Sequence, residues 1–243
     1  MRNYVLSNEY LVPANGGTGG IQKKFLRNDY WYKVDKTLGE GRSEHLVSLL
    51  LSHSNLPRDC YVWYEQCSIN GKQGCRSRSF TKSNEVVFSL NSIYKYYKHG
   101  VLENDLYAIQ DVVGRYNFLV NLISSVCSLD ARVYLKTIFL LDMLIENTDR
   151  HLSNICVIYN TVLHKFRFAP IFDNGLSLGV GNGSSARTIS GSFEQQVVAC
   201  GYPIVSTFKI DYDAVAKNAE LCSSLILCRN LEKYKSIFKK WTV

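Results

Sequence analysis

Residues 146–154 read ENTDRHLSN, a polar loop that directly follows a nearly all-apolar segment at residues 135–145. The apolar segment predicts a helix that is buried on most sides. Asp149 and Asn154 lie five residues apart. Phosphoryl-transfer catalytic loops use this spacing, because the aspartate positions the attacking hydroxyl and the asparagine holds magnesium. The same residues would also suit a plain polar cap at the end of a helix. The neighbouring motifs are therefore needed to distinguish a catalytic loop from a helix cap.

A second motif, PIFDNG at residues 170–175, has the composition of a metal-binding turn. The apolar residues 166–172 predict the second strand of a hairpin. This strand would deliver Asp173 into a turn whose glycine, Gly175, permits a positive φ. The hairpin would bring Asp173 close to Asn154, and a hard cation such as Mg²⁺ takes oxygen ligands of this kind. Asp-Asn-Gly is also a common β-turn, but its distance from Asn154 favours metal binding.

Lys33 lies in the strand-like run WYKV, residues 31–34. A lysine in a half-buried strand is costly unless it is paired. Eleven residues later, Glu44 falls in the helix that is predicted to follow. A strand lysine paired with a helix glutamate is the device with which kinases hold the α- and β-phosphates of ATP. Asp35 and Glu40 are rival partners, and an edge-strand lysine that faces water is the alternative.

A glycine-rich segment, NGGTGG at residues 15–20, precedes this lysine. Short apolar runs on either side of it, residues 10–12 and 31–34, predict a hairpin with a glycine-rich turn and a following strand. Backbone N–H groups exposed by glycines can cradle phosphate oxygens. The segment fits neither G-x-G-x-x-G nor the P-loop pattern, because Gln22 stands where the third kinase glycine would be. The phosphate-binding candidates in this segment are Gly17, Thr18, Gly19 and Gly20.

The order of these motifs is that of a protein kinase: glycine turn, strand lysine, helix glutamate, D-x-x-x-x-N and F-D-x-G. In detail, NTDRHLSN (147–154) and IFDNG (171–175) resemble the HipA-like serine/threonine kinases, a family of atypical bacterial kinases. WYKVD (31–35) and SEHL (43–46) also look like that family. The resemblance runs from about residue 15 to the C-terminus.

This resemblance implies a bilobal kinase fold that uses ATP and Mg²⁺ to phosphorylate a protein hydroxyl. It implies that Asp149 is the catalytic base and that Asn154 and Asp173 bind the metal. Lys33 would contact the phosphates, with Glu44 as its partner.

Two further positions follow from the resemblance. The hinge that holds adenine is expected at residues 78–81, where Arg78 and Phe80 are the candidate residues. Thr18 is the only hydroxyl residue within residues 15–20. It is therefore the candidate for an autophosphorylation that would switch the enzyme off.

The sequence also departs from the kinase pattern. The usual His-Arg before the catalytic aspartate is absent, and Arg150 and His151 follow it instead. Larger HipA proteins carry an extra subdomain before the glycine loop, where this chain has about fifteen residues. Either a small partner protein, such as an antitoxin, supplies that subdomain or the chain works without it. HipA-like kinases resemble toxins that phosphorylate translation components, which implies a protein substrate of that kind.

Asp142 stands within one of the most apolar stretches, residues 139–145. A carboxylate there must be paired or hydrogen-bonded. It precedes Asp149 by seven residues, or about two helical turns. We therefore expect Asp142 to reach the catalytic loop and fix Arg150, His151 or backbone N–H groups. The alternative is a solvent-facing position on a half-exposed helix.

The sequence as a whole predicts an α+β fold. We expect a strand-rich N-terminal lobe at residues 1–90, a helical C-terminal lobe at residues 91–243 and a cleft near residue 90. Further strands are predicted at residues 61–64 and 86–90. Helices are predicted from apolar periodicity at residues 41–51, 106–120 and 227–241.

Composition limits the alternatives. The 243 residues are 46% hydrophobic and 20% charged, which excludes disordered and coiled-coil classes. A net charge of +7 favours anionic partners, but no helix-turn-helix or basic stripe indicates direct nucleic-acid binding. No apolar run reaches the ~20 residues of a membrane helix and no secretory signal is visible, so we expect a cytoplasmic protein without membrane contact. The alternative functions are a small-molecule or lipid kinase and a nucleotide-binding regulatory module without turnover.

Overall fold

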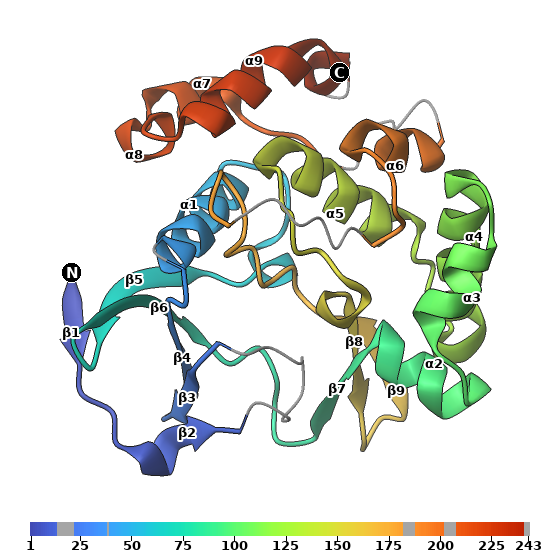
Figure 1. The fold of residues 1–243 in the computed structure, drawn as a ribbon, viewed down its shortest axis with the longest axis horizontal. Coiled ribbons are helices and arrows are strands. Elements are labelled where there is room, and N and C mark those ends of the chain that lie inside the picture. Colours follow the sequence, from blue (N-terminus) through green and yellow to red (C-terminus); the bar gives the residue numbers. More distant parts are fainter. Residues whose placement is uncertain (14–21, 38, 182–187, 202–207, 241–243) are drawn as a thin grey trace.

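A computed structural model of the chain describes residues 1–13, 22–37, 39–181, 188–201 and 208–240. Its N-terminal part is built on a six-stranded sheet with the order β1-β5-β6-β4-β3-β2 (Figure 1). Neighbouring strands are antiparallel, except that β1 runs parallel to β5. The strands are β1 (Arg2–Tyr4), β2 (Leu11–Val12), β3 (Lys24–Arg27), β4 (Tyr30–Val34), β5 (Tyr64–Ile69) and β6 (Lys72–Arg78).

The strands on either side of the glycine-rich segment are paired as a hairpin. β2 pairs with β3, and β4, which contains the predicted strand 31–34, follows. β3 and β6 were not predicted, because β6 (KQGCRSR) is largely polar and β3 (KFLR) has only two apolar residues between two charged ones. The strand predicted at residues 61–64 is displaced. Only Tyr64 belongs to β5, and Tyr61 instead forms an isolated bridge with Ile171.

Helix α1 (Glu40–Ser52) confirms the helix predicted at residues 41–51 and packs against β5 and β6. Gly41 allows this close approach, because a Cβ atom there would lie 2.5 Å from the backbone carbon of Gly74. A larger side chain at Gly41 would therefore push α1 away from the strands that it covers, and Glu44 away from Lys33 with it. Gly74 instead makes room for the neighbouring strand, because a Cβ atom there would lie 2.2 Å from the carbonyl oxygen of Lys33 on β4.

The C-terminal part is mostly helical, as predicted, and also contains a three-stranded sheet with the order β7-β8-β9. Its strands are β7 (Glu85–Ser89), β8 (Cys156–Asn160) and β9 (Lys165–Phe168). Its helices are α2 (Leu90–Lys98), α3 (Leu102–Ala108), α4 (Val112–Cys127), α5 (Arg132–Ile145), α6 (Phe193–Ala199), α7 (Tyr212–Lys217), α8 (Ala219–Cys222) and α9 (Leu225–Lys240). Single 3-10 turns are η1 (Asn8–Tyr10), η2 (Arg58–Cys60) and η3 (Leu152–Asn154).

Two predictions for this part need correction. The continuous helical period at residues 106–120 is interrupted, because α3 ends at Ala108 and Asp111 caps α4 by accepting a hydrogen bond from the Gly114 N–H (2.7 Å). The strand predicted at residues 166–172 ends at Phe168 as β9. The chain then runs through Pro170 into the bridge at Ile171.

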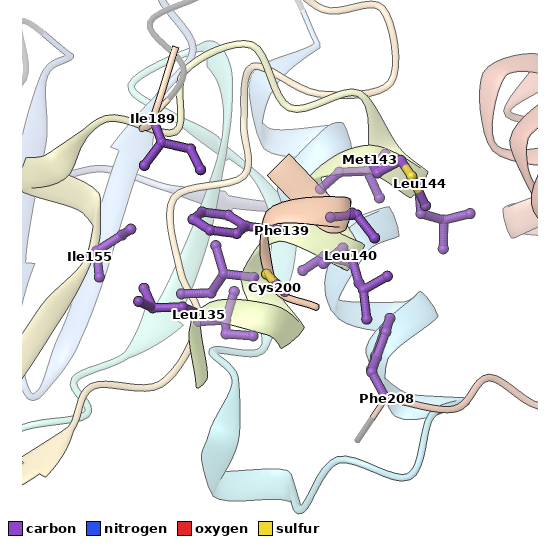
Figure 2. Packing of buried hydrophobic residues seen from close by; sticks show 14 of the residues in the cluster. Leu135, Phe139, Leu140, Met143, Leu144, Ile155, Ile189, Cys200 and Phe208 are labelled. Atoms are coloured by element: carbon purple, nitrogen blue, oxygen red, sulfur yellow. The ribbon is translucent and has the colours of Figure 1, made fainter. Parts of the chain in front are cut away.

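Helix α5 is the centre of the main hydrophobic core. Its residues Leu135, Phe139, Leu140, Met143 and Leu144 are all at most 1% exposed (Figure 2). They pack with side chains from several distant segments, namely Ile155, Ile189, Cys200 and Phe208. The apolar run 135–145 is therefore buried on most sides, as predicted. Within the described part of the chain, no helix has both the length and the apolar character needed to span a membrane.

A smaller core joins the two parts of the chain. Tyr64 and Cys75 of the first sheet pack with Cys156 and Ile158 of β8 and with Phe172. This cluster fixes the segment around Phe172 against the sheet to which Lys33 belongs. The predicted α+β fold class is thus confirmed, with a strand-rich N-terminal part and a mostly helical C-terminal part.

Candidate active site

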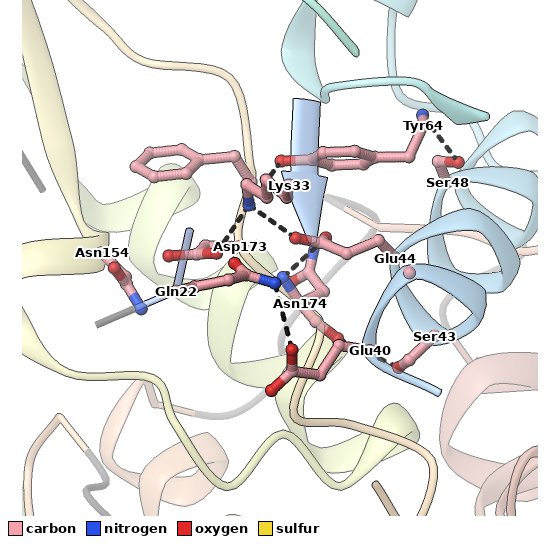
Figure 3. Close-up of polar contacts among 12 residues, drawn as sticks. Gln22, Lys33, Glu40, Ser43, Glu44, Ser48, Tyr64, Asn154, Asp173 and Asn174 are labelled. Atoms are coloured by element: carbon pink, nitrogen blue, oxygen red, sulfur yellow. Dashed lines mark hydrogen bonds and ion pairs between the residues drawn. The ribbon is translucent and has the colours of Figure 1, made fainter. Parts of the chain in front are cut away.

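Lys33 is the centre of a buried ion-pair cluster. Its Nζ atom lies 2.7 Å from Glu44 Oε1 and 2.7 Å from Asp173 Oδ1 (Figure 3). It also donates to the Tyr64 hydroxyl at 3.3 Å. Burial opposes the charge on the Lys33 ammonium, but the carboxylates of Asp173 and Glu44 outweigh it and raise its pKa well above 10.5. The cation is therefore fixed in position and permanently charged.

The rival partners of Lys33 are engaged elsewhere. Asp35 accepts hydrogen bonds from the Gly39 and Gly41 N–H groups, at 3.1 and 2.8 Å, and so holds the start of α1. Glu40 accepts from the Gln22 side chain at 3.0 Å and from the Lys36 N–H at 2.7 Å. The structure thus pairs Lys33 with the more distant glutamate that the sequence pattern favoured.

The turn that contains Asp173 is tied to the same helix. Glu44 uses its second oxygen, Oε2, to accept from the Asn174 N–H at 2.8 Å, and the Ser43 hydroxyl donates to the Asn174 carbonyl at 3.1 Å (Figure 3). The positive φ predicted for Gly175 belongs instead to Asp173, at 60°. Aspartate tolerates this left-handed conformation better than most residues, because its short side chain bonds locally. An added Cβ at Gly175 would make only an ordinary contact with the Cβ of Glu40, at 3.4 Å.

Asp173 remains ionised in this setting. Burial alone would raise the pKa of its carboxyl group, but the positive charges of Lys33 and Lys24 lower it well below 3.8. Lys33 uses Oδ1 of this carboxylate, and no described residue hydrogen-bonds to Oδ2. One oxygen is therefore available to a cation.

Arg150 fixes the turn from the opposite side. Its guanidinium donates to both carboxylate oxygens of Asp142, with the shortest contacts at 3.1 Å, to the Phe172 carbonyl at 2.9 Å and to Asn174 Oδ1 at 2.6 Å. Asp142 is 3% exposed and Arg150 is 2% exposed, so the solvent-facing alternative for Asp142 does not hold. Arg150 is one of the partners expected for Asp142, and it connects α5 directly to the residues on both sides of Asp173.

The loop before β8 brings Asp149 and Asn154 together through hydrogen bonds. The side chain of Asn147 accepts from the Asp149 N–H at 3.0 Å, and Asn154 Nδ2 donates to the Asp149 carbonyl at 3.1 Å. Burial raises the pKa of the Asp149 carboxyl above 3.8; the charge of His151, whose Nε2 lies 4.0 Å from Asp149 Oδ2, opposes this shift. The carboxylate itself stays 41% exposed, so a substrate hydroxyl can reach it.

Asn154 and Asp173 offer a set of donors that fits Mg²⁺. Asn154 Oδ1 is buried and has no hydrogen-bond partner, which is costly for an acceptor unless something else binds it. One free carboxylate oxygen and one unpartnered amide oxygen suit a hard cation that takes its remaining ligands from substrate phosphates and water. Within the described residues no group of three His, Cys, Asp or Glu side chains could hold a metal, so phosphate oxygens would have to complete the site.

A cavity of about 150 Å³ adjoins this cluster. Lys33, Asp173 and Phe80 line it, and the ring of Phe80 lies 5.5 Å from that of Phe172. The remaining lining residues are Lys24, Trp31, Tyr64, Ser77, Ser79, Thr81, Val87 and Phe172. Aromatic faces beside charged groups are what a nucleotide base and its phosphates require.

The other candidate residues fall outside this arrangement. Arg78 does not line this cavity, but it lines a second one with Arg58 and Trp63, and Phe80 borders both. Gly17, Thr18, Gly19 and Gly20 lie outside the described residues.

Sequence reasoning did not single out Lys24, Tyr64 or Asn147. Asn147 had a signal, because an asparagine two residues before a loop N–H commonly accepts from it. Strand pairing brings Lys24 and Tyr64 to the site, and this pairing has no local signature in the sequence.

Comparison with known proteins gives one solved structure to report. No protein-family model and no curated protein sequence matches the chain. The chain is similar to the crystal structure of a Helicobacter pylori proinflammatory kinase, CtkA, with 17% sequence identity and a TM-score of 0.47. The match covers 73% of this chain and 62% of that one, so the chain spans less than two thirds of that kinase. A likeness of this degree concerns the fold alone, and the chemistry follows from the residues of the site.

Proposed function

We propose that the chain is an ATP-dependent serine/threonine protein kinase. One observation carries the proposal: the buried ammonium of Lys33 on β4 lies 2.7 Å from a carboxylate oxygen of Glu44 on α1 and 2.7 Å from one of Asp173. Lys33 and Asp173 line a cavity together with aromatic residues. A buried lysine with two carboxylates is expensive to assemble. Binding of nucleotide phosphates gives a reason for retaining it.

Each residue then has a defined task. Lys33 would hold the phosphates of ATP, and Glu44 would fix the lysine. Asp149 would accept the proton of the substrate hydroxyl, and its partly exposed carboxylate is accessible to it. Asp173 and Asn154 would hold Mg²⁺, which neutralises the negative charge that develops on the transferred phosphoryl group.

The test is mass spectrometry of the protein after incubation with ATP and Mg²⁺, with and without a bacterial lysate. We expect a phosphate-sized mass increase on serine or threonine of a protein, and its loss when Mg²⁺ is removed. Phosphate found only on metabolites or lipids would assign the chain to the small-molecule kinases. ATP binding without any transfer would assign it to the regulatory modules without turnover.

The biological setting is part of the proposal. By resemblance, we propose a substrate among translation components and a small partner protein, such as an antitoxin, that would complete the N-terminal side. Co-purification of the tagged chain from its native host, followed by identification of phosphorylated proteins, would test both. A substrate unrelated to translation would contradict this setting and leave the kinase proposal standing.

A further inference from the structure

A second lysine, Lys24, faces the same cavity as Lys33. The two residues are directly opposite each other in the antiparallel pair of β3 and β4. Directly opposed residues project from the same face of a sheet, and both lysines line the cavity beside Asp173. The neighbouring Lys23 lies on the other face, where it is exposed, lines a different cavity and places its ammonium 5.1 Å from the centre of the Phe25 ring.

The position of Lys24 opposite Lys33 is energetically unfavourable, and no direct contact with a described residue compensates for it. Like charges directly opposite on two strands destabilise a sheet. Lys33 compensates with two carboxylates, but no described residue makes a hydrogen bond or an ion pair with the Lys24 ammonium. Lys24 is also half-buried, and burial, reinforced by the charge of Lys33, lowers its pKa below 10.5 despite the attraction of Asp173. A partly buried, unpaired cation calls for an anion that is not part of the chain.

The charge around the cavity indicates what that anion is. Lys33 with Glu44 and Asp173 carries a net charge of minus one, which would repel a polyphosphate. Lys24 brings the cluster to neutrality, and its ammonium has no hydrogen-bond or ion-pair partner among the described residues. Lys33, by contrast, is fixed by two carboxylates and has little donor capacity left.

We propose that Lys24 is a second phosphate-binding residue and that it makes the site selective for a nucleoside polyphosphate over a nucleoside. This inference rests on the proposed function, because it names a further residue of the same ATP site. In this role Lys24 binds phosphate oxygens directly, whereas the charge of Lys33 also keeps Asp173 and Glu44 in place.

The test compares Lys24→Gln with Lys23→Gln, which removes the same charge from the adjacent residue on the opposite face. Affinities for ATP and adenosine are measured by calorimetry at constant Mg²⁺. We expect Lys24→Gln to weaken ATP about tenfold or more, the usual effect of losing a hydrogen bond to a charged group. Adenosine affinity should not change, and Lys23→Gln should bind both ligands as the wild type does.

A second measurement separates a binding role from a structural one. Without nucleotide, Lys24→Gln should melt close to the wild type, because the substitution removes both the repulsion from Lys33 and the attraction to Asp173. A lower melting temperature, or equal losses of ATP affinity in the two variants, would overturn the inference. Unchanged ATP affinity in Lys24→Gln would overturn the inference about Lys24 and leave the proposed function standing. A wild type that binds no ATP would overturn both.

Discussion

Arg150 and Asp142 form a buried pair in which the guanidinium donates to both carboxylate oxygens, with the shortest contacts at 3.1 Å. The pair joins the end of α5 to the loop after it. Arg150 then continues to the Phe172 carbonyl and to the side chain of Asn174. Asp142 therefore positions Asp173 through Arg150, although it touches neither the cavity nor Asp173.

Asp142→Ala should lower stability and activity together. The substitution leaves the Arg150 guanidinium buried without its charge partner, and breaking a buried pair in this way costs about 3–5 kcal/mol. Chemical denaturation measures the loss. Asp130→Ala is the matched control, because Asp130 pairs with Arg132 on the surface and this variant should unfold close to the wild type. If the two variants unfold alike, Asp142 is not part of a stabilising network.

Asp149→Asn should stop transfer and leave nucleotide binding intact. The loss of a positioned base reduces the rate by about 10²–10⁴-fold. The fold should persist, because the hydrogen bonds of this residue within the loop use its backbone N–H and carbonyl groups, which the variant keeps. Single-turnover transfer and ATP affinity are measured on the same preparation. Wild-type transfer by the variant would show that Asp149 is not the base.

Asp173→Asn should weaken the dependence of ATP affinity on Mg²⁺. The variant removes the negative charge that would bind the cation and also releases one of the two carboxylates around Lys33. Calorimetric titration of ATP with and without Mg²⁺ gives the effect. Asp213→Asn, at an exposed position on α7, is the control and should behave as the wild type. An unchanged Mg²⁺ effect in Asp173→Asn would make this residue an ordinary turn aspartate.

Much of the site could be predicted because several of its residues would be unfavourable at their positions without a partner. Lys33 in an aromatic strand and Asp142 in an apolar helix both need partners, and the structure supplies Glu44 and Arg150. The sequences of β3 and β6 give no comparable signal, because their residues are buried only by the neighbouring strands of the sheet. Lys24 was missed for that reason, since only its register opposite Lys33 brings it to the cavity.

The conformation of the turn that contains Asp173 could also not be predicted from local rules. Glycine is the usual residue at a positive φ, which led to the prediction for Gly175. In the structure, Glu44 and Arg150 hold the backbone and side chain of Asn174, and this fixes Asp173 in the left-handed conformation. Contacts from residues far away in the sequence decided between these two positions of the same turn.

His151→Ala should shift the acid limb of the pH–activity profile to higher pH. A catalytic base works only when it is ionised, so activity falls as the pH drops through the pKa of the Asp149 carboxyl. Burial raises this pKa above 3.8, and the positive charge of His151 opposes the shift. Removing His151 takes away this opposing charge, which raises the pKa further. At a pH above both pKa values Asp149 is ionised in both proteins, so their kcat values at the plateau should agree. His151→Lys keeps a positive charge and should leave the limb near its wild-type position. A limb that stays in place or moves to lower pH in His151→Ala would refute the electrostatic role, and a loss of plateau activity would assign His151 to holding the loop.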